Sequence, residues 1–332
     1  MIYDISVIKD NSNRSEDLAK TLKGLARLKK GNLSVEFVIV DNGSNDGTKS
    51  IVESFSNCLP VRYLFEPRVG KNRALNHALE KGGLGNIVVF TDDDVDPSPN
   101  WLTSIVSTCE RWPQHSVFGG QIDVVLPKGS IPKWVYQPYI RSWVFAEHRY
   151  SDKECFYEGG ATPFGPNFWV RKDIFNNGRR FDETVGPHPT NRILGGDISF
   201  LLGLLNDGYK IVYSPTAVVG HRIQPTILKI SAIWRRAYQA GRGVAHIYGL
   251  PQVRLLNRYP SIWRLYRYGA IMWNTYKALF SLMFYLNERR AVKWVWRITD
   301  IGYHIEAIRL SRAIENISNI KKDLVKSTAK SY

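Results

Sequence analysis

Short apolar runs and amphipathic segments alternate along the first hundred residues of the chain. Mostly apolar runs occupy residues 5–8, 35–40, 61–65 and 87–90, and leucines repeat at helical spacing within residues 15–29. Continuous apolar strands that alternate with helices are typical of a parallel sheet covered by helices on both faces. The pattern therefore predicts an α/β fold in this part of the chain.

Two polar segments follow directly after predicted strands. Residues 41–47 come after the second apolar run, and residues 92–96 come after the fourth. Because ligands of parallel α/β sheets bind at the carboxyl ends of the strands, these two segments are the first candidates for a binding site.

The later part of the chain changes character twice. Residues 101–221 contain short strand-like runs at 117–118, 122–126 and 211–213, among many aromatic residues and turns rich in Gly and Pro. We expect mixed strands and loops there, building the acceptor side of a site. After Pro225 the apolar spacing becomes helical, and residues 298–326 form one amphipathic helix or two.

One helical segment, residues 268–286, is a borderline candidate for crossing a membrane. Its apolar residues are interrupted by Asn274, Thr275, Lys277 and Ser281, whereas a spanning helix needs about 20 mostly apolar residues. An interfacial or buried helix is the better prediction. The first residues lack the basic start and the cleavage site of a secretory signal, and we expect none.

Composition adds one unusual feature, a net charge of +15. The 332 residues are 44% hydrophobic and 23% charged, which excludes a globally disordered chain. The three cysteines are far apart and form no CxxC pair, which argues against a disulfide scaffold and a cysteine zinc site.

The positive charge is confined to one part of the chain. Residues 1–221 contain 25 Lys and Arg against 25 Asp and Glu, whereas residues 222–332 contain 20 against 5, with five of the ten Trp and nine of the 17 Tyr. Basic side chains mixed with amphipathic aromatics suit an anionic bilayer better than a nucleic-acid groove. We predict that residues 222–332 are a basic, aromatic-rich helical extension that meets an anionic membrane surface or an anionic acceptor, and we expect no nucleic-acid partner.

The segment after the fourth strand carries three consecutive carboxylates, Asp92, Asp93 and Asp94. Like charges repel in a partly buried turn, and a divalent cation such as Mg²⁺ or Mn²⁺ removes that penalty. Side chains alternate along a strand, so we expect Asp92 and Asp94 to act together while Asp93 faces elsewhere. The alternative is a solvated acidic turn before the next helix.

The segment after the second strand, residues 41–48, is rich in short polar side chains. These could read a nucleobase, and the helix that follows could help to bind phosphate. The alternative is a plain turn with an Asn or Asp at the start of the helix.

Taken in order, these motifs resemble family 2 glycosyltransferases. Residues 38–48 are similar to the nucleotide-binding loop of that family, residues 70–76 to its glycine-lysine segment at the diphosphate, and residues 90–97 to its metal-binding D-x-D strand end. Weaker similarities follow at residues 164–167 and 181–183. The segments 195–197, 208–210 and 215–221 resemble the region that carries the catalytic base, so the ordered set covers about residues 5–221.

The resemblance implies an A-type glycosyltransferase fold, a Rossmann-like and mostly parallel sheet flanked by helices, with the basic helical extension after it. The catalytic domain would be residues 1–221, with a nucleotide-binding half at about 1–100 and an acceptor half at about 101–221. The reaction would be inverting transfer of a single hexose from a nucleotide-sugar, by family analogy a UDP-sugar, to a hydroxyl of a glycan or lipid-linked acceptor.

The resemblance also implies a role for each site residue. Asp197 would be the general base, and Asp94 with His221 would bind the Mn²⁺ or Mg²⁺ cofactor. The nucleotide would contact Asp41, Asn42, Lys71, Arg73, Asp92 and Asp93. Donor-sugar or acceptor contacts would come from Gly165, Asn167, Trp169 and Gly196. Outside the resemblance, Trp234 and Arg235 could close over donor or acceptor, and the alternative is an amphipathic helix with a solvated basic face.

Three departures from the family pattern stand out. Residues 9–14 replace the usual turn after the first strand, Gly196 replaces the usual Glu beside the base, and Trp169 stands where a small residue is common, which would narrow the acceptor cleft. The Gln-x-x-Arg-Trp sequence of processive polysaccharide synthases is missing, which favours addition of one sugar. Two alternatives stay open, a polyprenyl-phosphate sugar transferase and a non-catalytic binder of nucleotide or nucleic acid. For the leading hypothesis we expect a cytoplasmic enzyme held peripherally at the inner face of the membrane.

Overall fold

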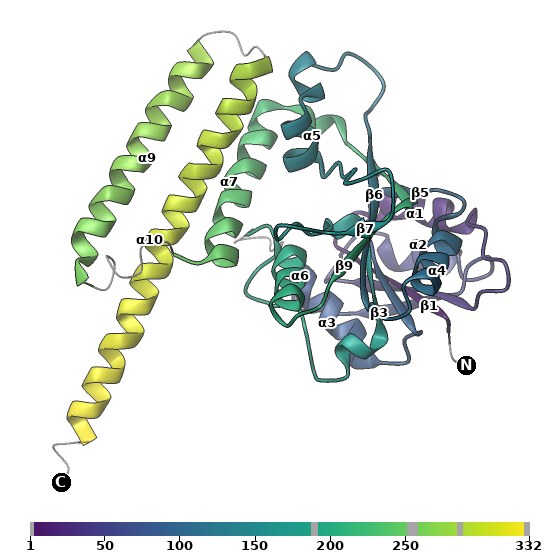
Figure 1. The fold of residues 1–332 in the computed structure, drawn as a ribbon. Helices are drawn as coiled ribbons and strands as arrows, with labels where there is room; N and C mark the ends of the chain where they lie inside the picture. Colours follow the sequence, from purple (N-terminus) through teal and green to yellow (C-terminus); the bar gives the residue numbers. More distant parts are fainter. Residues whose placement is uncertain (1–2, 187–191, 251–257, 284–287, 329–332) are drawn as a thin grey trace. The chain divides into compact units, whose positions relative to one another are not determined.

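The structure is a computed structural model that describes residues 3–186, 192–250, 258–283 and 288–328. Its internal contacts divide the chain into two compact units, Met1–Lys229 and Ile230–Tyr332. The division follows Lys229 rather than His221, since the 3₁₀ turn Pro225–Leu228 still belongs to the first unit. Figure 1 shows the elements of both units.

One mixed sheet forms the centre of the first unit. The strands lie in the order β3-β2-β1-β4-β8-β6-β9-β5, and β7 pairs with β9. Neighbours from β3 to β4 are parallel, as are β6 and β9, whereas β8, β5 and β7 run antiparallel to their partners. The strands are β1 (Ile5–Asn11), β2 (Val35–Asp41), β3 (Val61–Phe65), β4 (Ile87–Phe90), β5 (Val95–Pro97), β6 (Val117–Val125), β7 (Cys155–Phe156), β8 (Phe168–Arg171) and β9 (Ile211–Arg222).

Helices cover both faces of this sheet, as the unbroken apolar strands predict. Side chains alternate along β2, so Phe37 and Ile39 pack under one group of helices while Val38 and Val40 pack under the other. The first group is α1 (Ser15–Ala26), α2 (Thr48–Ser54) and α4 (Trp101–Arg111); the second is α3 (Lys71–Lys81) and α6 (Gly196–Asn206). A further helix, α5 (Pro138–Phe145), follows β6 and a short turn.

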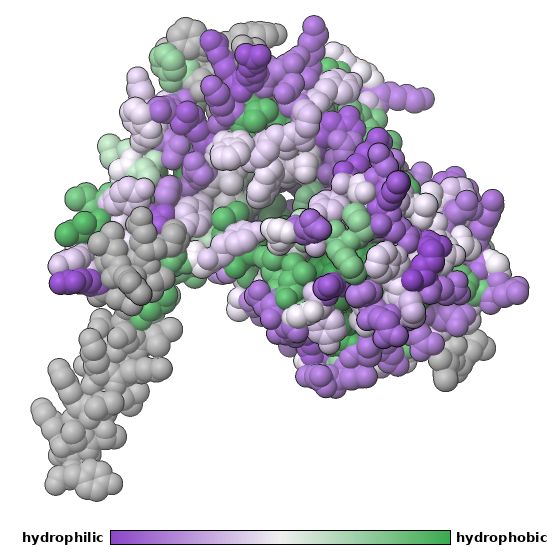
Figure 2. All heavy atoms as spheres, in the orientation of Figure 1, coloured by the Kyte–Doolittle hydropathy of each residue, from purple (hydrophilic) through white to green (hydrophobic). Residues whose placement is uncertain are grey.

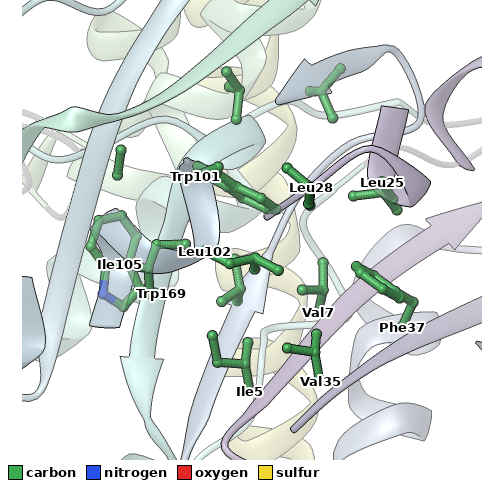
Figure 3. Packing of buried hydrophobic residues seen from close by; sticks show 14 of the residues in the cluster. Ile5, Val7, Leu25, Leu28, Val35, Phe37, Trp101, Leu102, Ile105 and Trp169 are labelled. Atoms are coloured by element: carbon green, nitrogen blue, oxygen red, sulfur yellow. The ribbon is translucent and has the colours of Figure 1, made fainter. Parts of the chain in front are cut away.

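The core under the first group of helices is built around two tryptophans. Figure 3 shows Trp101 and Leu102 of α4 beside aliphatic side chains of the central strands, with Trp169 close to Ile105. Trp169 is fully buried and stacks on Phe118. The expectation that Trp169 narrows an acceptor cleft is therefore wrong: β8 inserts between β4 and β6, where both faces of the sheet are covered.

Strand β9 is longer than the sequence pattern suggests. Residues 211–222 form one strand that contains Pro215, and its register against β6 shifts between Gly120 and Gln121. The shift leaves residues 215–217 outside the regular pairing, which accommodates a proline that has no N–H to donate. Likewise the two expected runs at 117–118 and 122–126 are one strand, β6.

The described part of the second unit consists of helices α7 (Ile230–Tyr248), α9 (Pro260–Met283) and α10 (Glu288–Thr328). The expected helix at residues 298–326 is part of this single long α10. A Cβ on Gly241 would lie 1.9 Å from the carbonyl oxygen of Thr299, and one on Gly302 would lie 2.1 Å from that of Tyr238. The two glycines therefore let the backbones of α7 and α10 touch where they cross.

The borderline segment 268–286 falls mostly in α9, with residues 284–286 outside the described residues. Among the helices that the structure describes, none is both long and apolar enough to traverse a bilayer.

Candidate active site

Carboxylates and a lysine from three distant segments meet at the carboxyl ends of the central strands. Lys71 is the first residue of α3, Asp92 follows β4, and Asp197 lies in the first turn of α6. Lys71 Nζ lies 2.7 Å from Asp92 Oδ1 and 3.5 Å from Asp197 Oδ2. The lysine thus links the carboxylate of the D-x-D segment to the expected base.

The environment of Asp197 raises the pKa of its carboxyl group. Burial has the largest effect, and the positive charge of Lys71 partly opposes it. Burial is also the largest single effect on Asp92, but the charge and hydrogen bond of Lys71, with the charge of His221, together outweigh it and lower the pKa of Asp92. Two carboxylates that share one lysine therefore differ in proton affinity, and Asp197 is the better base of the two.

Gly165 provides the room that Asp197 needs. A Cβ at position 165 would lie 2.1 Å from Asp197 Oδ2, so any other residue would displace the carboxylate. Gly196 has a similar role, because a Cβ there would lie 2.5 Å from Nδ2 of Asn72. Because position 196 is Gly and not the usual Glu, no side chain there occupies the space that Asn72 fills.

Asn72 and Asn76 of α3 hold the loop before α6. Nδ2 of Asn72 donates to the carbonyl oxygens of Asp182 and Val185, at 2.6 and 2.7 Å. Asn76 accepts a hydrogen bond from the backbone N of Phe181 and donates to its carbonyl oxygen. The two segments that resemble the family at residues 70–76 and 181–183 are therefore in direct contact with each other.

The three consecutive carboxylates do not alternate as expected. Asp92 faces Lys71, whereas Asp93 and Asp94 both pair with Arg14. The reason is that residues 93–94 form a turn instead of continuing the strand. That turn is fixed from two sides, since the Thr21 hydroxyl donates to the carbonyl oxygen of Asp93 and the backbone N of Arg222 donates to that of Asp94.

His221 faces Asp94, as the sequence hypothesis requires. Nε2 of His221 lies 3.2 Å from Oδ1 of Asp94, and Nδ1 lies 2.6 Å from the carbonyl oxygen of Phe145. Because a carbonyl oxygen only accepts, Nδ1 carries a proton, and in the neutral ring the lone pair is on Nε2. Burial raises the pKa of Asp94, but a protonated His221 and Arg14 together outweigh burial and hold that pKa well below its usual range.

These residues fit a divalent cation. Oδ1 of Asp94 is buried and accepts no hydrogen bond within the described part of the chain, although it faces Nε2 of His221. A carboxylate oxygen and an imidazole nitrogen are suitable ligands for Mn²⁺. No group of three or more His, Cys, Asp and Glu side chains among the described residues is arranged to hold a metal by itself. Such an ion would therefore need additional ligands, as Mg²⁺ commonly obtains from substrate phosphates.

The expected base-binding loop is held by its own side chains. Asp41 is buried at the end of β2, where it accepts hydrogen bonds from the Tyr63 hydroxyl (2.7 Å) and from the backbone N of Ser44 (2.9 Å). Nδ2 of Asn42 donates to the carbonyl oxygens of Glu66 and Arg68, and its Oδ1 accepts from the backbone N of Gly70. Asn42 therefore ties this loop to the start of α3, a structural role that the sequence did not suggest.

The remaining expected contact residues have other surroundings. Asn167 is fully buried and bonded to Trp101 Nε1 and to the carbonyl oxygens of Gln121 and Ala217, so it is a core residue and not a sugar contact. Trp234 and Arg235 lie exposed on α7, in the second unit. Arg73, on the first turn of α3, pairs with Glu183 at 3.1 Å.

Charged residues that sequence reasoning missed lie beneath the site. Lys9 is fully buried at the end of β1, and no hydrogen-bond partner for its Nζ occurs in the described residues. Burial lowers the pKa of Lys9 and raises that of the neighbouring Asp10 to about 7. Two features of the sequence could have pointed to these residues. One is the Lys-Asp pair near the end of an otherwise apolar strand, and the other is Arg14, three residues after that strand.

The fold and the site define the class of the protein. A mixed sheet covered by helices on both faces, with four parallel strands (β3-β2-β1-β4) on one side and carboxylates gathered at its strand ends, is the architecture of an A-type glycosyltransferase. Among solved structures, the mannosyltransferase PcManGT from Pyrobaculum calidifontis, in complex with GDP-Man and Mn²⁺, superposes with a TM-score of 0.59 at 16% sequence identity, covering 93% of this chain and 88% of that one. This similarity shows the fold alone.

The sequence identifies the family. Residues 6–179 match the family described as glycosyl transferase family 2, and the chain belongs to that family. Glycosyltransferase AglE of Haloferax volcanii is 26% identical over 253 residues, which are 76% of each chain. Glucosyl-dolichyl phosphate glucuronosyltransferase of the same organism is 22% identical over 200 residues, 57% of this chain and 59% of that protein. The expected family, fold and enzyme class are confirmed.

Proposed function

We propose that the protein transfers a single sugar, with inversion, from a UDP-sugar to a hydroxyl of a glycan or lipid-linked acceptor, with Asp197 as general base. The observation that carries this proposal is the position of Lys71 Nζ between Asp92 and Asp197. It brings the donor-binding strand end and the base to one place, as a single displacement requires.

The reaction needs one bond to form and one to break. The acceptor oxygen attacks the anomeric carbon, the bond from that carbon to the diphosphate oxygen breaks, and the nucleoside diphosphate leaves with the electron pair. Asp197 takes the proton of the acceptor hydroxyl, and burial, which raises its pKa, makes it a stronger base than an exposed carboxylate. Inversion follows because no enzyme nucleophile takes part.

Donor binding is assigned to the remaining strand-end residues. Asp41 would bind the base and Asp92 the ribose, while Lys71 and Arg73 would supply positive charge to the diphosphate. Asp93 is already paired with Arg14, so we assign it to holding Arg14 and the turn. Gly165 and Gly196 would shape the cleft around Asp197, as their close approaches to Asp197 and Asn72 suggest.

Asp94 and His221 would hold the divalent cation. When bound, Mn²⁺ or Mg²⁺ supplies positive charge that stabilises the departing diphosphate. The chain's contribution is the orientation of the two ligands: the Phe145 carbonyl fixes the imidazole through Nδ1, and Arg222 fixes the backbone of Asp94.

The acceptor side is supported by the relatives and by the charge of the chain. The glucuronosyltransferase relative is named for a dolichyl phosphate-linked substrate, which favours a lipid-linked acceptor here as well. We assign catalysis to residues 1–221 and acceptor or membrane contact to residues 222–332. The enzyme would then act on the inner face of a membrane without crossing it.

The test is donor hydrolysis and transfer by the wild type and Asp197→Asn. With Mn²⁺ and a panel of UDP- and GDP-sugars, we expect the wild type to release nucleoside diphosphate and Asp197→Asn to lose about 10²–10⁴-fold in kcat. Donor affinity, measured by thermal shift, should change little, because Asn keeps the shape of the side chain. Asp94→Asn should instead raise the Mn²⁺ concentration needed for half-maximal activity. Unchanged turnover in both variants would contradict the proposal.

A further inference from the structure

Helix α9 has one exposed apolar face that no described segment of the chain covers. We call this face the α9 stripe; its members recur at spacings of three, four and seven residues and are each at least half exposed: Ile262, Leu265, Tyr266, Met272, Trp273, Tyr276, Leu279 and Phe280. The opposite side of α9 packs inside the helical unit through buried Trp263, Arg267 and Ala278. Figure 2 shows apolar (green) side chains at the surface of α9.

The interior of the unit explains why the stripe stays outside. The Arg267 guanidinium lies over the rings of Trp263 and Tyr303, and it is 2.9 Å from Nδ1 of His304 on α10. These contacts fix the rotation of α9 about its axis, so the stripe faces away from α10. Leu265 and Met272 are 71% and 73% exposed, whereas soluble proteins seldom expose a contiguous apolar row of this kind.

The charge around the stripe identifies the occupant. Between Asp207 and Glu288 the sequence contains eleven Lys and Arg and no Asp or Glu. Lys277 lies 3.9 Å above the ring of Trp273 at one edge of the stripe, and Arg312 of α10 donates to the Tyr268 hydroxyl near the other. An apolar row bordered by cations and rich in Trp and Tyr complements anionic lipid headgroups. A second copy of the chain would instead bring like charges together.

We propose that the α9 stripe lies flat in the headgroup region of an anionic bilayer and is the element that docks the protein. Its apolar side chains enter the acyl boundary, while Lys277 and Arg312 contact anionic headgroups. This inference deepens the membrane part of the proposed function and rests on it for the location of a lipid-linked acceptor.

The test compares three versions of the full-length protein by vesicle flotation. The stripe variant is Leu265→Gln/Met272→Gln/Leu279→Gln, and the matched control is Val125→Gln/Tyr248→Gln/Ile314→Gln, also three exposed apolar residues. Gln is a good helix former, so α9 should persist. On vesicles of seven parts phosphatidylcholine to three parts phosphatidylglycerol, we expect the stripe variant to bind at least about tenfold more weakly than wild type, and the control to bind as wild type.

Two further measurements keep the result decisive. Leu265→Phe/Met272→Phe/Leu279→Phe keeps the surface apolar and should retain binding, so it answers the question even if the Gln variant folds poorly. Raising salt from about 0.1 to 0.5 M should weaken wild-type binding, because screening reduces the headgroup attraction.

The proposal would be overturned if the wild type did not bind the vesicles, or if the stripe variant bound them as strongly as the wild type. It would also be overturned if the wild type were a dimer that the stripe substitutions convert to a monomer while vesicle binding stays the same. Nucleotide-sugar hydrolysis is measured on the same samples without vesicles. Its absence in the wild type would contradict the proposed function and leave the vesicle result standing.

Discussion

Lys71 is the residue on which the two halves of the candidate site depend. Its ammonium group touches Asp92 and Asp197, and these two carboxylates raise the pKa of Lys71 well above its ordinary value despite burial. The lysine is therefore charged at every pH at which an enzyme assay is practical. Its charge in turn limits how far burial raises the pKa of Asp197.

Lys71→Met should move the acidic limb of the kcat–pH profile. Removing the positive charge removes an effect that lowers the pKa of Asp197, so the base stays protonated to higher pH and the limb shifts upward. Arg73→Met is the matched control, because Arg73 lies two residues along α3 and pairs with Glu183 instead. An unshifted limb in Lys71→Met would mean that Asp197 is not the titrating base.

Trp169 shows how burial decides the role of an aromatic residue. It stacks on Phe118, and its Nε1 lies 3.3 Å from Sγ of Cys109, with no surface exposed. Trp169→Ala should therefore lower the free energy of unfolding by about 3–5 kcal/mol through the cavity that it leaves. Trp234→Ala, at 44% exposure, should cost less than about 1 kcal/mol. Urea denaturation checks both, and equal costs would contradict the core assignment.

At the scale of single elements, β9 connects the core to the metal-binding hypothesis. The strand passes Pro215 by a shift in register and then pairs regularly with β5, which places His221 opposite Val95. Because Val95 directly follows Asp94, the pairing brings the imidazole to the carboxylate. A histidine in a β-strand and an aspartate in a turn thus become neighbours through sheet register alone.

Helices α7 and α10 share a buried ion pair that stabilises the second unit. Glu306 Oε2 lies 2.6 Å from Arg242 Nε, and its Oε1 lies 3.1 Å from Nε2 of His246. Burial by itself would raise the pKa of Glu306. The hydrogen bonds from His246 and Arg242 have the larger combined effect with the charges of these two residues, and the pKa of Glu306 is lowered to about 2. The pair therefore stabilises the fold above the ordinary glutamate pKa of 4.5, and the contribution is lost as the pH falls toward 2.

Glu306→Gln should destabilise the second unit by about 3 kcal/mol at neutral pH, because the buried Arg242 would lose the carboxylate that lies 2.6 Å from its Nε. The difference between wild type and variant should shrink as the pH falls below about 4. Glu53→Gln is the control, since its pair with Lys49 is exposed and worth less than about 1 kcal/mol. Urea denaturation followed by far-UV circular dichroism measures both, and a pH-independent difference would contradict the ion-pair argument.

At the scale of the whole molecule, the two units have separate cores. The two large apolar clusters lie within the first unit, and a smaller one, around Trp263, Ala307 and Ile308, lies within the second. The site residues that meet at the strand ends all belong to the first unit. The net positive charge belongs mostly to the second, so catalysis and surface attachment are expected to be separable.

A truncated protein that ends at Lys229 should fold and bind nucleotide without the helical unit. We expect a single cooperative unfolding transition and a thermal shift with UDP and Mn²⁺ similar to that of the full chain, because the core and the site are both retained. Vesicle binding should be lost. Failure of this protein to unfold cooperatively would mean that the two units depend on each other for stability.

Much of the fold was predictable because the relevant signals are local. Apolar runs such as residues 35–40 are buried on both faces, and polar segments follow them where the strands end, so the sheet and its binding edge could be read from the sequence. Trp169 and Asn167 were misassigned because a motif position does not reveal burial. The pairing of Arg14 with Asp93 and Asp94 joins positions about 80 residues apart, and no local pattern encodes it.

The alternation of strands and helices in the first hundred residues, the family, and the confinement of the +15 charge to residues 222–332 could all be read from the sequence, because each depends on neighbours along the chain. The contact of Lys71 with Asp92 and Asp197, the approach of His221 to Asp94 and the uncovered face of α9 became visible only in the folded chain. Each of these depends on distance and burial between segments far apart in the chain, which the packing of the elements sets.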